Sequence, residues 1–169
     1  NVKNIPSNRV ARNQSCLFTL TDYSYKKPNL DNRFLEILHP HFNKLIFFAQ
    51  GTGDLKYIKT LSIFEEISSK LQVIETVKAF DSILKNENSV EYIGTRLHGG
   101  VRALQLGVPS LIISIDNRAM EIHKYTNLPV IERDEIEKLE KWLNFELAFK
   151  PFTLPVENIH KWKMQLRSC

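Results

Sequence analysis

A chain of 169 residues, with 43% hydrophobic and 25% charged residues, has the composition of one ordinary globular domain, which excludes a disordered, collagen-like or low-complexity protein. The net charge of +4 is too small, without a run of Lys and Arg, to indicate a nucleic-acid partner. The longest apolar runs fall far short of the ~20 residues that a transmembrane segment needs, so the sequence predicts a soluble protein.

The two ends of the chain carry the only cysteines, Cys16 and Cys169. Neither has metal-ligand spacing or the density of a secreted disulfide scaffold, so we predict reduced thiols and a cytoplasmic location. The first residue is Asn1, and residues 1–15 are polar and aperiodic. We expect residues 1–15 to be a linker or a truncated start, and residues 16–169 to form one domain.

Short apolar runs of strand length alternate with segments of helical period from Cys16 onward. Several runs are apolar on both faces, as strands of a parallel sheet are when helices cover each side. This pattern predicts a three-layer α/β domain, Rossmann-like, with a mainly parallel sheet. The predicted strands are 16–20, 44–49, 71–75, 90–93, 110–115 and, more weakly, 129–131.

Amphipathic segments lie between these strands. Gly107 and Pro109 mark the end of one helix, and Asp134 has the residue type and position of an N-cap. The predicted helices are 31–38, one apolar stripe after Asp54 that includes Tyr57, Leu61, Phe64 and Ile67, 77–85, 100–106, a helix after Asp134, and a terminal helix over 156–167.

Ligands of doubly wound sheets bind outside the carboxyl ends of the strands, and three strand ends carry polar residues or glycines. The strongest is 94–100, which presents Arg96 and His98 and enters a helix through Gly99 and Gly100. A helix start offers unpaired N–H groups, Arg offers a planar fork of donors, and His can exchange a proton near neutral pH. Together they predict a site for an anionic substrate whose reaction moves a proton.

Each of these features also has a purely structural interpretation. Arg96 could cap a neighbouring helix, His98 could be a satisfied buried imidazole, and the glycines could serve only the turn. We favour the site because the features occur together.

The other two strand ends are 50–54 and 116–118. The first has two glycines, not the three of a dinucleotide fingerprint, and lacks the Lys-Ser/Thr of a P-loop, which disfavours NAD and ordinary NTP hydrolysis. Asp54 could cap the next helix, or Gln50 and Gly51 could contact a ligand. Asp116 and Arg118 could be an N-cap and its neighbour, or ligand contacts. No histidine pair has convincing metal spacing, so we predict no metal.

The residues from Tyr92 to Gly100, read as Tyr-Ile-Gly-Thr-Arg-Leu-His-Gly-Gly, are followed by Ala-Leu, by Gly-Val-Pro, by an apolar strand and by Asp-Asn-Arg at 116–118. This series resembles the signature of the polysaccharide pyruvyl transferase family. The resemblance covers about residues 50–131, and Gln50, Gly51 and Asp54 are similar to that family's Gln-Gly-x-x-Asp turn. Arg118 stands where the family often has Lys.

The resemblance implies the carboxyl-terminal lobe of a two-lobed, GT-B-like enzyme that transfers pyruvyl from phosphoenolpyruvate to a sugar as a cyclic ketal, without a metal or cofactor. It implies that Arg96 binds the donor, with help from the backbone at Leu97, and that His98 is the general acid. The implied partners are phosphoenolpyruvate, a saccharide acceptor and a missing amino-terminal lobe.

Two other functions fit the same residues. A nucleotide-sugar glycosyltransferase lobe would use the helix start for a diphosphate, although no obvious ribose-binding acid is present. A non-catalytic carbohydrate-binding or assembly domain would keep the fold without the reaction.

Overall fold

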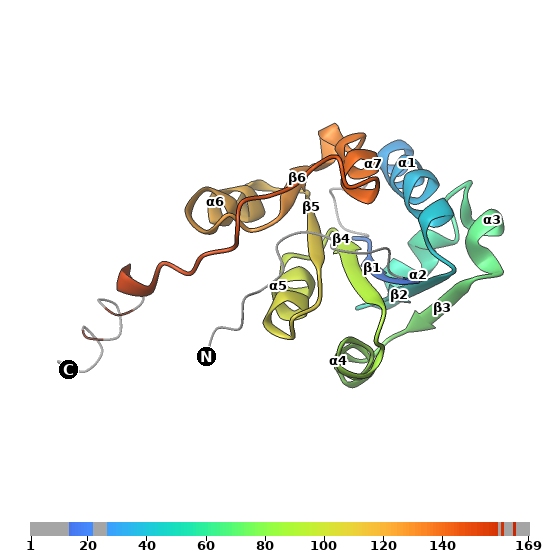
Figure 1. Cartoon of the computed structure of the whole chain (residues 1–169). Coiled ribbons are helices and arrows are strands. Elements are labelled where there is room, and N and C mark those ends of the chain that lie inside the picture. The colour runs from blue at the N-terminus through green and yellow to red at the C-terminus, as the bar shows by residue number, and fades with distance from the viewer. Residues whose placement is uncertain (1–13, 22–26, 159, 161–163, 165–169) are drawn as a thin grey trace.

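A single parallel sheet of six strands forms the centre of the molecule, as seen in the computed structural model, which describes residues 14–21, 27–158, 160 and 164 (Figure 1). All six predicted strands are present and all neighbouring pairs are parallel. The strands are β1 (Ser15–Thr19), β2 (Lys44–Phe48), β3 (Leu71–Ile74), β4 (Val90–Gly94), β5 (Ser110–Ser114) and β6 (Val130–Glu132).

The strand order is β3-β2-β1-β4-β5-β6, the order of a doubly wound, Rossmann-like sheet. The direction of winding reverses between β1 and β4, which pair along Ser15–Thr19 and Val90–Gly94. The connections that leave the carboxyl ends of these two strands therefore diverge and open a crevice. This crevice lies where the sequence predicts a site, after Gly94.

Helices cover both faces of the sheet, which confirms the predicted three layers (Figure 1). On one face, side chains of β1 such as Phe18 pack in a core with α1 (Pro28–Leu38), α2 (Thr52–Ile58), α3 (Phe64–Ser68) and α7 (Lys138–Leu143). On the other face, Leu17, Ile46 and Tyr92 pack with α4 (Val77–Asn86) and α5 (Leu97–Gln105), and Ile112 packs with α6 (Asn117–Thr126).

Three helix predictions differ from the structure in detail. The stripe after Asp54 is divided into α2 and α3 by a turn, in which Thr60 and Leu61 donate to the carbonyls at the end of α2. The helix predicted over 100–106 begins earlier, at Leu97, directly after the strand end. Asp134 is not an N-cap: it lies in a 3-10 turn, Arg133–Glu135, and pairs with Lys27 at 2.6 Å.

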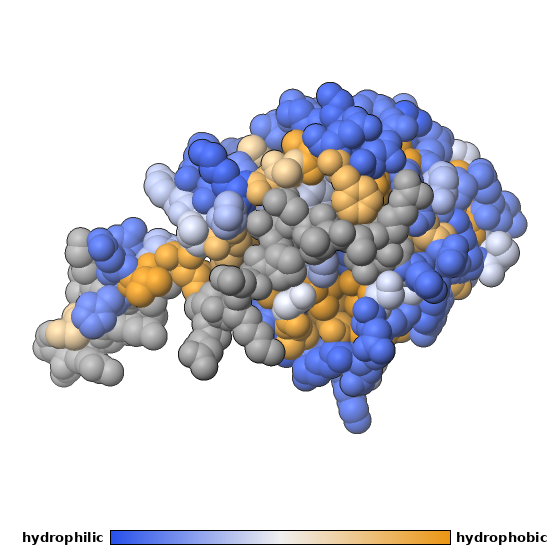
Figure 2. Space-filling view, viewed as in Figure 1, coloured by the Kyte–Doolittle hydropathy of each residue, from blue (hydrophilic) through white to orange (hydrophobic). Residues whose placement is uncertain are grey.

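The segment after α7 returns to the end of α6, where the Thr153 amide donates to the Thr126 carbonyl at 2.7 Å. Farther along, apolar Leu154 and Val156 are exposed, and Figure 2 shows apolar side chains on this projecting segment. Most of the terminal helix predicted over 156–167, with Ile159, Trp162 and Leu166, lies outside the described residues, as do residues 1–13 of the predicted linker. Within the described part of the chain, no helix combines the length and apolarity that crossing a membrane requires.

Candidate functional site

The loop between β4 and α5 is held in place by β1. The Thr95 amide donates to the Thr19 carbonyl at 3.1 Å, and the Arg96 amide donates to Thr19 Oγ1 at 3.2 Å. Tyr92 Oη donates to the Arg96 carbonyl at 2.8 Å and lies 2.7 Å from Thr19 Oγ1. Burial raises the pKa of the Tyr92 phenol above its usual range, which keeps it a hydrogen-bond donor. The backbone that carries Arg96 into α5 is therefore fixed.

The Arg96 side chain is oriented by Asp54 from the first turn of α2. Arg96 Nη2 lies 2.9 Å from Asp54 Oδ1 and 2.8 Å from Oδ2. Asp54 is 1% exposed, and its Oδ2 also accepts a hydrogen bond from the Gln50 amide at 2.9 Å. Both carboxylate oxygens therefore have hydrogen-bond partners within the protein. Asp54 is thus not the simple helix cap that one interpretation predicts, because the N-cap position belongs to Gly51. It links the 50–54 turn to the Arg96 loop.

A cavity of about 220 Å³ opens at this edge of the sheet. It brings together six of the nine residues predicted as site residues, from three different strand ends. They are Gln50, Arg96, Leu97, His98, Asp116 and Arg118, and the remaining lining residues are Thr21, Thr95, Ile113, Ser114, Ile115 and Ala119.

The predicted ligand contacts at Gly51, Gly99 and Gly100 are not among the lining residues of this cavity. Gly99 and Gly100 are buried against the sheet, where an added Cβ would lie 2.6 Å from Tyr92 Oη and 2.4 Å from Ile112 Cγ1 respectively. The Gly100 amide donates to the Arg96 carbonyl. The two glycines let α5 approach β4 and β5 closely, a packing role that the sequence pattern does not distinguish from ligand approach.

This packing role predicts a difference between two glycine substitutions. Gly100→Ala should lower the free energy of unfolding by about 1–3 kcal/mol, because the new methyl group collides with Ile112. Gly51→Ala meets nothing within 4 Å of its Cβ, at a φ of −150°, and should change stability by less than about 0.5 kcal/mol. Urea unfolding of both variants measures the difference; equal stabilities would contradict the packing role.

The start of α5 still offers backbone donors to the cavity. The first N–H groups of a helix have no intrahelical acceptor. Among the described residues, no acceptor is found for the amides of Leu97, His98 and Gly99, and two of these residues line the cavity. The open backbone donors at the cavity therefore belong to Leu97 and His98, two residues before the predicted Gly99 and Gly100.

His98 is exposed at the second position of α5 and lines the cavity beside Arg96. Other histidines have structural partners: His39 Nε2 lies 3.1 Å from Glu66 Oε1, and His123 Nδ1 lies 2.6 Å from the Leu128 carbonyl. Across the described residues, no group of three or more His, Cys, Asp or Glu side chains is placed to hold a metal ion. His98 is thus the histidine that can act in this cavity.

Asp116 and Arg118 form the outer wall. Asp116 is the N-cap of α6, and its Oδ1 accepts from the Arg118 amide at 2.9 Å. Its Oδ2 lies 2.7 Å from Arg118 Nη2, and the hydrogen bond from the Arg118 side chain lowers the pKa of Asp116. The capping interpretation is confirmed. Both residues also line the cavity, and the Arg118 side chain is 70% exposed.

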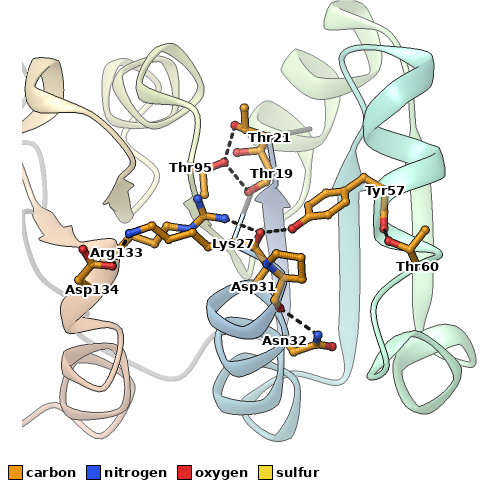
Figure 3. Close-up of polar contacts among 11 residues, drawn as sticks. Thr19, Thr21, Lys27, Asp31, Asn32, Tyr57, Thr60, Thr95, Arg133 and Asp134 are labelled. Carbon is orange, nitrogen blue, oxygen red and sulfur yellow. Dashed lines mark hydrogen bonds and ion pairs between the residues drawn. The ribbon is translucent and has the colours of Figure 1, made fainter. Parts of the chain in front are cut away.

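Sequence reasoning missed three hydroxyl residues in the same cavity, Thr21, Thr95 and Ser114. Thr21 Oγ1 and Thr95 Oγ1 lie 2.8 Å apart, which connects the ends of β1 and β4 (Figure 3). Thr21 and Thr95 follow predicted strands and Ser114 lies at the carboxyl end of one, so the rule that ligands bind at strand ends could have found them as well.

Comparison with known proteins shows the fold and no more. The sequence matches no protein-family model and no curated protein. The structure is similar to that of UDP-GlcNAc 2-epimerase from Methanocaldococcus jannaschii in complex with UDP-GlcNAc and UDP, at a TM-score of 0.55 and 19% identity, over 89% of this chain and 46% of that one. A second structure of the same enzyme gives a TM-score of 0.51, with 19% identity over 90% and 47% of the two chains. This chain therefore spans about half the length of these proteins, and its fold is a Rossmann-like lobe of GT-B type.

Proposed function

We propose that this chain is one lobe of an enzyme that transfers the pyruvyl group of phosphoenolpyruvate to two hydroxyls of a sugar. The observation that carries the proposal is the cavity at the start of α5, where Arg96, His98 and open helix amides line one space. These are the residues whose sequence resembles the pyruvyl transferase signature. An amino-terminal lobe facing this one would complete the acceptor site.

The reaction needs an acid and an anion site. Protonation of C3 of phosphoenolpyruvate places positive charge on C2, and the first sugar hydroxyl adds there. The C2–O bond to phosphate then breaks, the second hydroxyl adds, and the products are a ketal and inorganic phosphate. One hydroxyl proton is balanced by the proton gained at C3, and the other leaves with phosphate. His98 would supply the proton, while Arg96 and the amides of the helix start would stabilise the phosphate as it leaves.

The size of the cavity and the open amides at the start of α5 support a small anionic donor. Its volume of about 220 Å³ lies below the ~300–1,000 Å³ typical of pockets for drug-sized ligands. Asp54 offsets part of the Arg96 charge and Asp116 pairs with Arg118, so the amides at the start of α5 must share in binding a doubly charged phosphate.

A nucleotide sugar is the competing substrate, because a protein of the same fold has been solved with UDP-GlcNAc and UDP. Such an enzyme would need a group for the ribose hydroxyls. The α5 segment, Leu97–Gln105, contains no Asp or Glu, and its Arg102 is turned to Asp81 at 2.6 Å. The lack of such a group in α5 favours phosphoenolpyruvate over a nucleotide sugar. Binding of UDP, compared with binding of phosphoenolpyruvate, tests this preference.

Arg96→Ala should weaken phosphoenolpyruvate binding by about 1.5–3 kcal/mol, because a charge-assisted contact is lost. Arg96→Lys keeps the charge, preserves more of the fold, and should lose less than Arg96→Ala. Isothermal titration calorimetry with phosphoenolpyruvate and with UDP measures both effects.

The matched control is Arg102→Ala, which removes an arginine from the same helix but outside the cavity. Its affinity for phosphoenolpyruvate should equal that of the wild type. Unchanged affinity in folded Arg96 variants, or binding of UDP in preference to phosphoenolpyruvate, would contradict the proposed donor.

A further inference from the structure

A second and larger cavity, of about 550 Å³, lies beside the first. The two share the wall formed by Ser114, Ile115 and Asp116 at the end of β5. The rest of its lining comes from Lys27 at the start of α1, from one side of α6 between Asn117 and Lys124, and from Glu132, Arg133 and Asp134 at the end of β6 and in the turn that follows. A molecule held here would lie next to one held beside Arg96.

The positive charges of this second cavity are already balanced. Lys124 Nζ lies 2.5 Å from Glu121 Oε1, and Lys27 Nζ lies 2.6 Å from Asp134 Oδ1. Arg133 pairs with Asp31, which also accepts from Tyr57 Oη; Figure 3 shows this chain of contacts and the Lys27–Asp134 pair. A phosphate would need a surplus of cationic donors, so the lining does not favour an anion.

Arg133 gives the cavity a rigid wall. Its side chain is 5% exposed and that of Asp31 is 2% exposed. The buried Arg133–Asp31 pair connects the end of β6 to α1, and the hydrogen bond that Tyr57 donates to Asp31 connects α2 to the same pair. The wall is therefore preorganised, as a binding subsite requires.

Two polar side chains of the lining have no hydrogen-bond or ion-pair partner among the described residues: the carboxylate of Glu132 and the amide of Asn117. Both residues are exposed at the cavity, which also has the apolar Met120 and Ile115. A carboxylate accepts hydrogen bonds, an amide accepts and donates them, and the apolar side chains can contact C–H groups. This combination matches a sugar ring, which has hydroxyls on its rim and C–H groups on its faces.

We infer that this second cavity is the acceptor subsite and takes a neutral pyranose, with Glu132 and Asn117 holding its hydroxyls. The inference rests on the proposed function and deepens it, since pyruvyl transfer needs a sugar diol next to the donor. The volume fits, because about 550 Å³ lies within the usual range for ligand pockets, whereas the Arg96 cavity is smaller.

The test is ligand-detected NMR on the whole chain, with methyl β-D-glucopyranoside, methyl β-D-galactopyranoside and methyl α-D-mannopyranoside as probes. At least one glycoside should bind the wild type. Glu132→Ala should weaken its binding about tenfold or more, because a hydrogen bond to a charged group is lost. Asn117→Ala should weaken it less. Glu140→Ala, an exposed carboxylate of α7 outside the cavity, is the matched control and should bind like the wild type.

Phosphoenolpyruvate binding, measured on the same samples, separates the two proposals. Loss of glycoside binding in Glu132→Ala with unchanged phosphoenolpyruvate binding supports the acceptor subsite. Wild-type protein that binds phosphoenolpyruvate but no glycoside, or binds a glycoside equally well without Glu132, overturns the subsite and leaves the proposed function standing. Displacement of the glycoside by UDP alone would assign the cavity to a nucleotide and overturn the inference.

Discussion

Asp54→Ala should lower the free energy of unfolding by about 3 kcal/mol, at the lower end of the range for removing one partner of a buried ion pair. The variant loses the two contacts of Asp54 with Arg96 and the hydrogen bond from the Gln50 amide. It also leaves the Arg96 guanidinium, with a side chain only 15% exposed, without this counter-charge. The effect is not larger because that exposure lets water reach part of the guanidinium. Urea unfolding measures the loss.

Asp81→Ala is the matched control, since it removes a carboxylate that also contacts an arginine through two oxygens. The Asp81–Arg102 pair lies at the surface, with side chains 24% and 40% exposed. Exposed pairs contribute about 0.2–1 kcal/mol, so the control should lose much less stability than Asp54→Ala. Similar losses in the two variants would show that burial of the Asp54–Arg96 pair does not make it more stabilising than an exposed pair.

The Asp54 pair also has a consequence for binding, because it fixes the direction of Arg96. Asp54→Asn keeps the shape of the side chain and the hydrogen bond from Gln50, but it removes the negative charge. An arginine released from this pair would bind an anion more strongly but in a less defined position. Asp54 therefore acts as a positioning residue for the site that we propose.

The fold is predictable from the sequence because each strand is a short apolar run bounded by turn residues. For that reason, β1 through β6 all fall within two residues of their predicted bounds. The break between α2 and α3 is not predictable from the apolar stripe, because residues on both sides of it face the same core. The Asp134 prediction is wrong for a similar reason. A local cap signal does not show that a 3-10 turn precedes the helix, or that Lys27 pairs with this carboxylate.

The candidate site is predictable in part. The rule that ligands bind at the carboxyl ends of parallel strands is local, and it identifies Arg96, His98 and Asp116 without knowledge of the strand order. The Asp54–Arg96 contact spans 42 residues and depends on α2 lying beside the start of α5, which no local pattern gives. The glycines show the same limit, because the closeness of Gly100 to Ile112 is set by the pairing of β4 with β5.

If the proposed two-lobed pyruvyl transferase is correct, His98→Gln should reduce its turnover about 100-fold or more, as removal of a general acid does, while phosphoenolpyruvate binding changes little. His98 is exposed and has no hydrogen-bond partner among the described residues, so its replacement should cost little stability. Gln cannot deliver a proton to C3 of phosphoenolpyruvate, but it can keep polar contacts in the cavity. Steady-state release of phosphate gives the turnover, and calorimetry gives the donor affinity.

The control for this substitution is His39→Gln, because His39 pairs with Glu66 and does not line the cavity. It should transfer pyruvyl at the wild-type rate. The split between turnover and binding is what identifies an acid. A residue that only positions the donor would lower both together, because donor binding and the transition state would lose the same contact. Equal losses in His98→Gln, or a rate near that of the wild type, would assign the proton to another group and leave Arg96 and the start of α5 as an anion site alone.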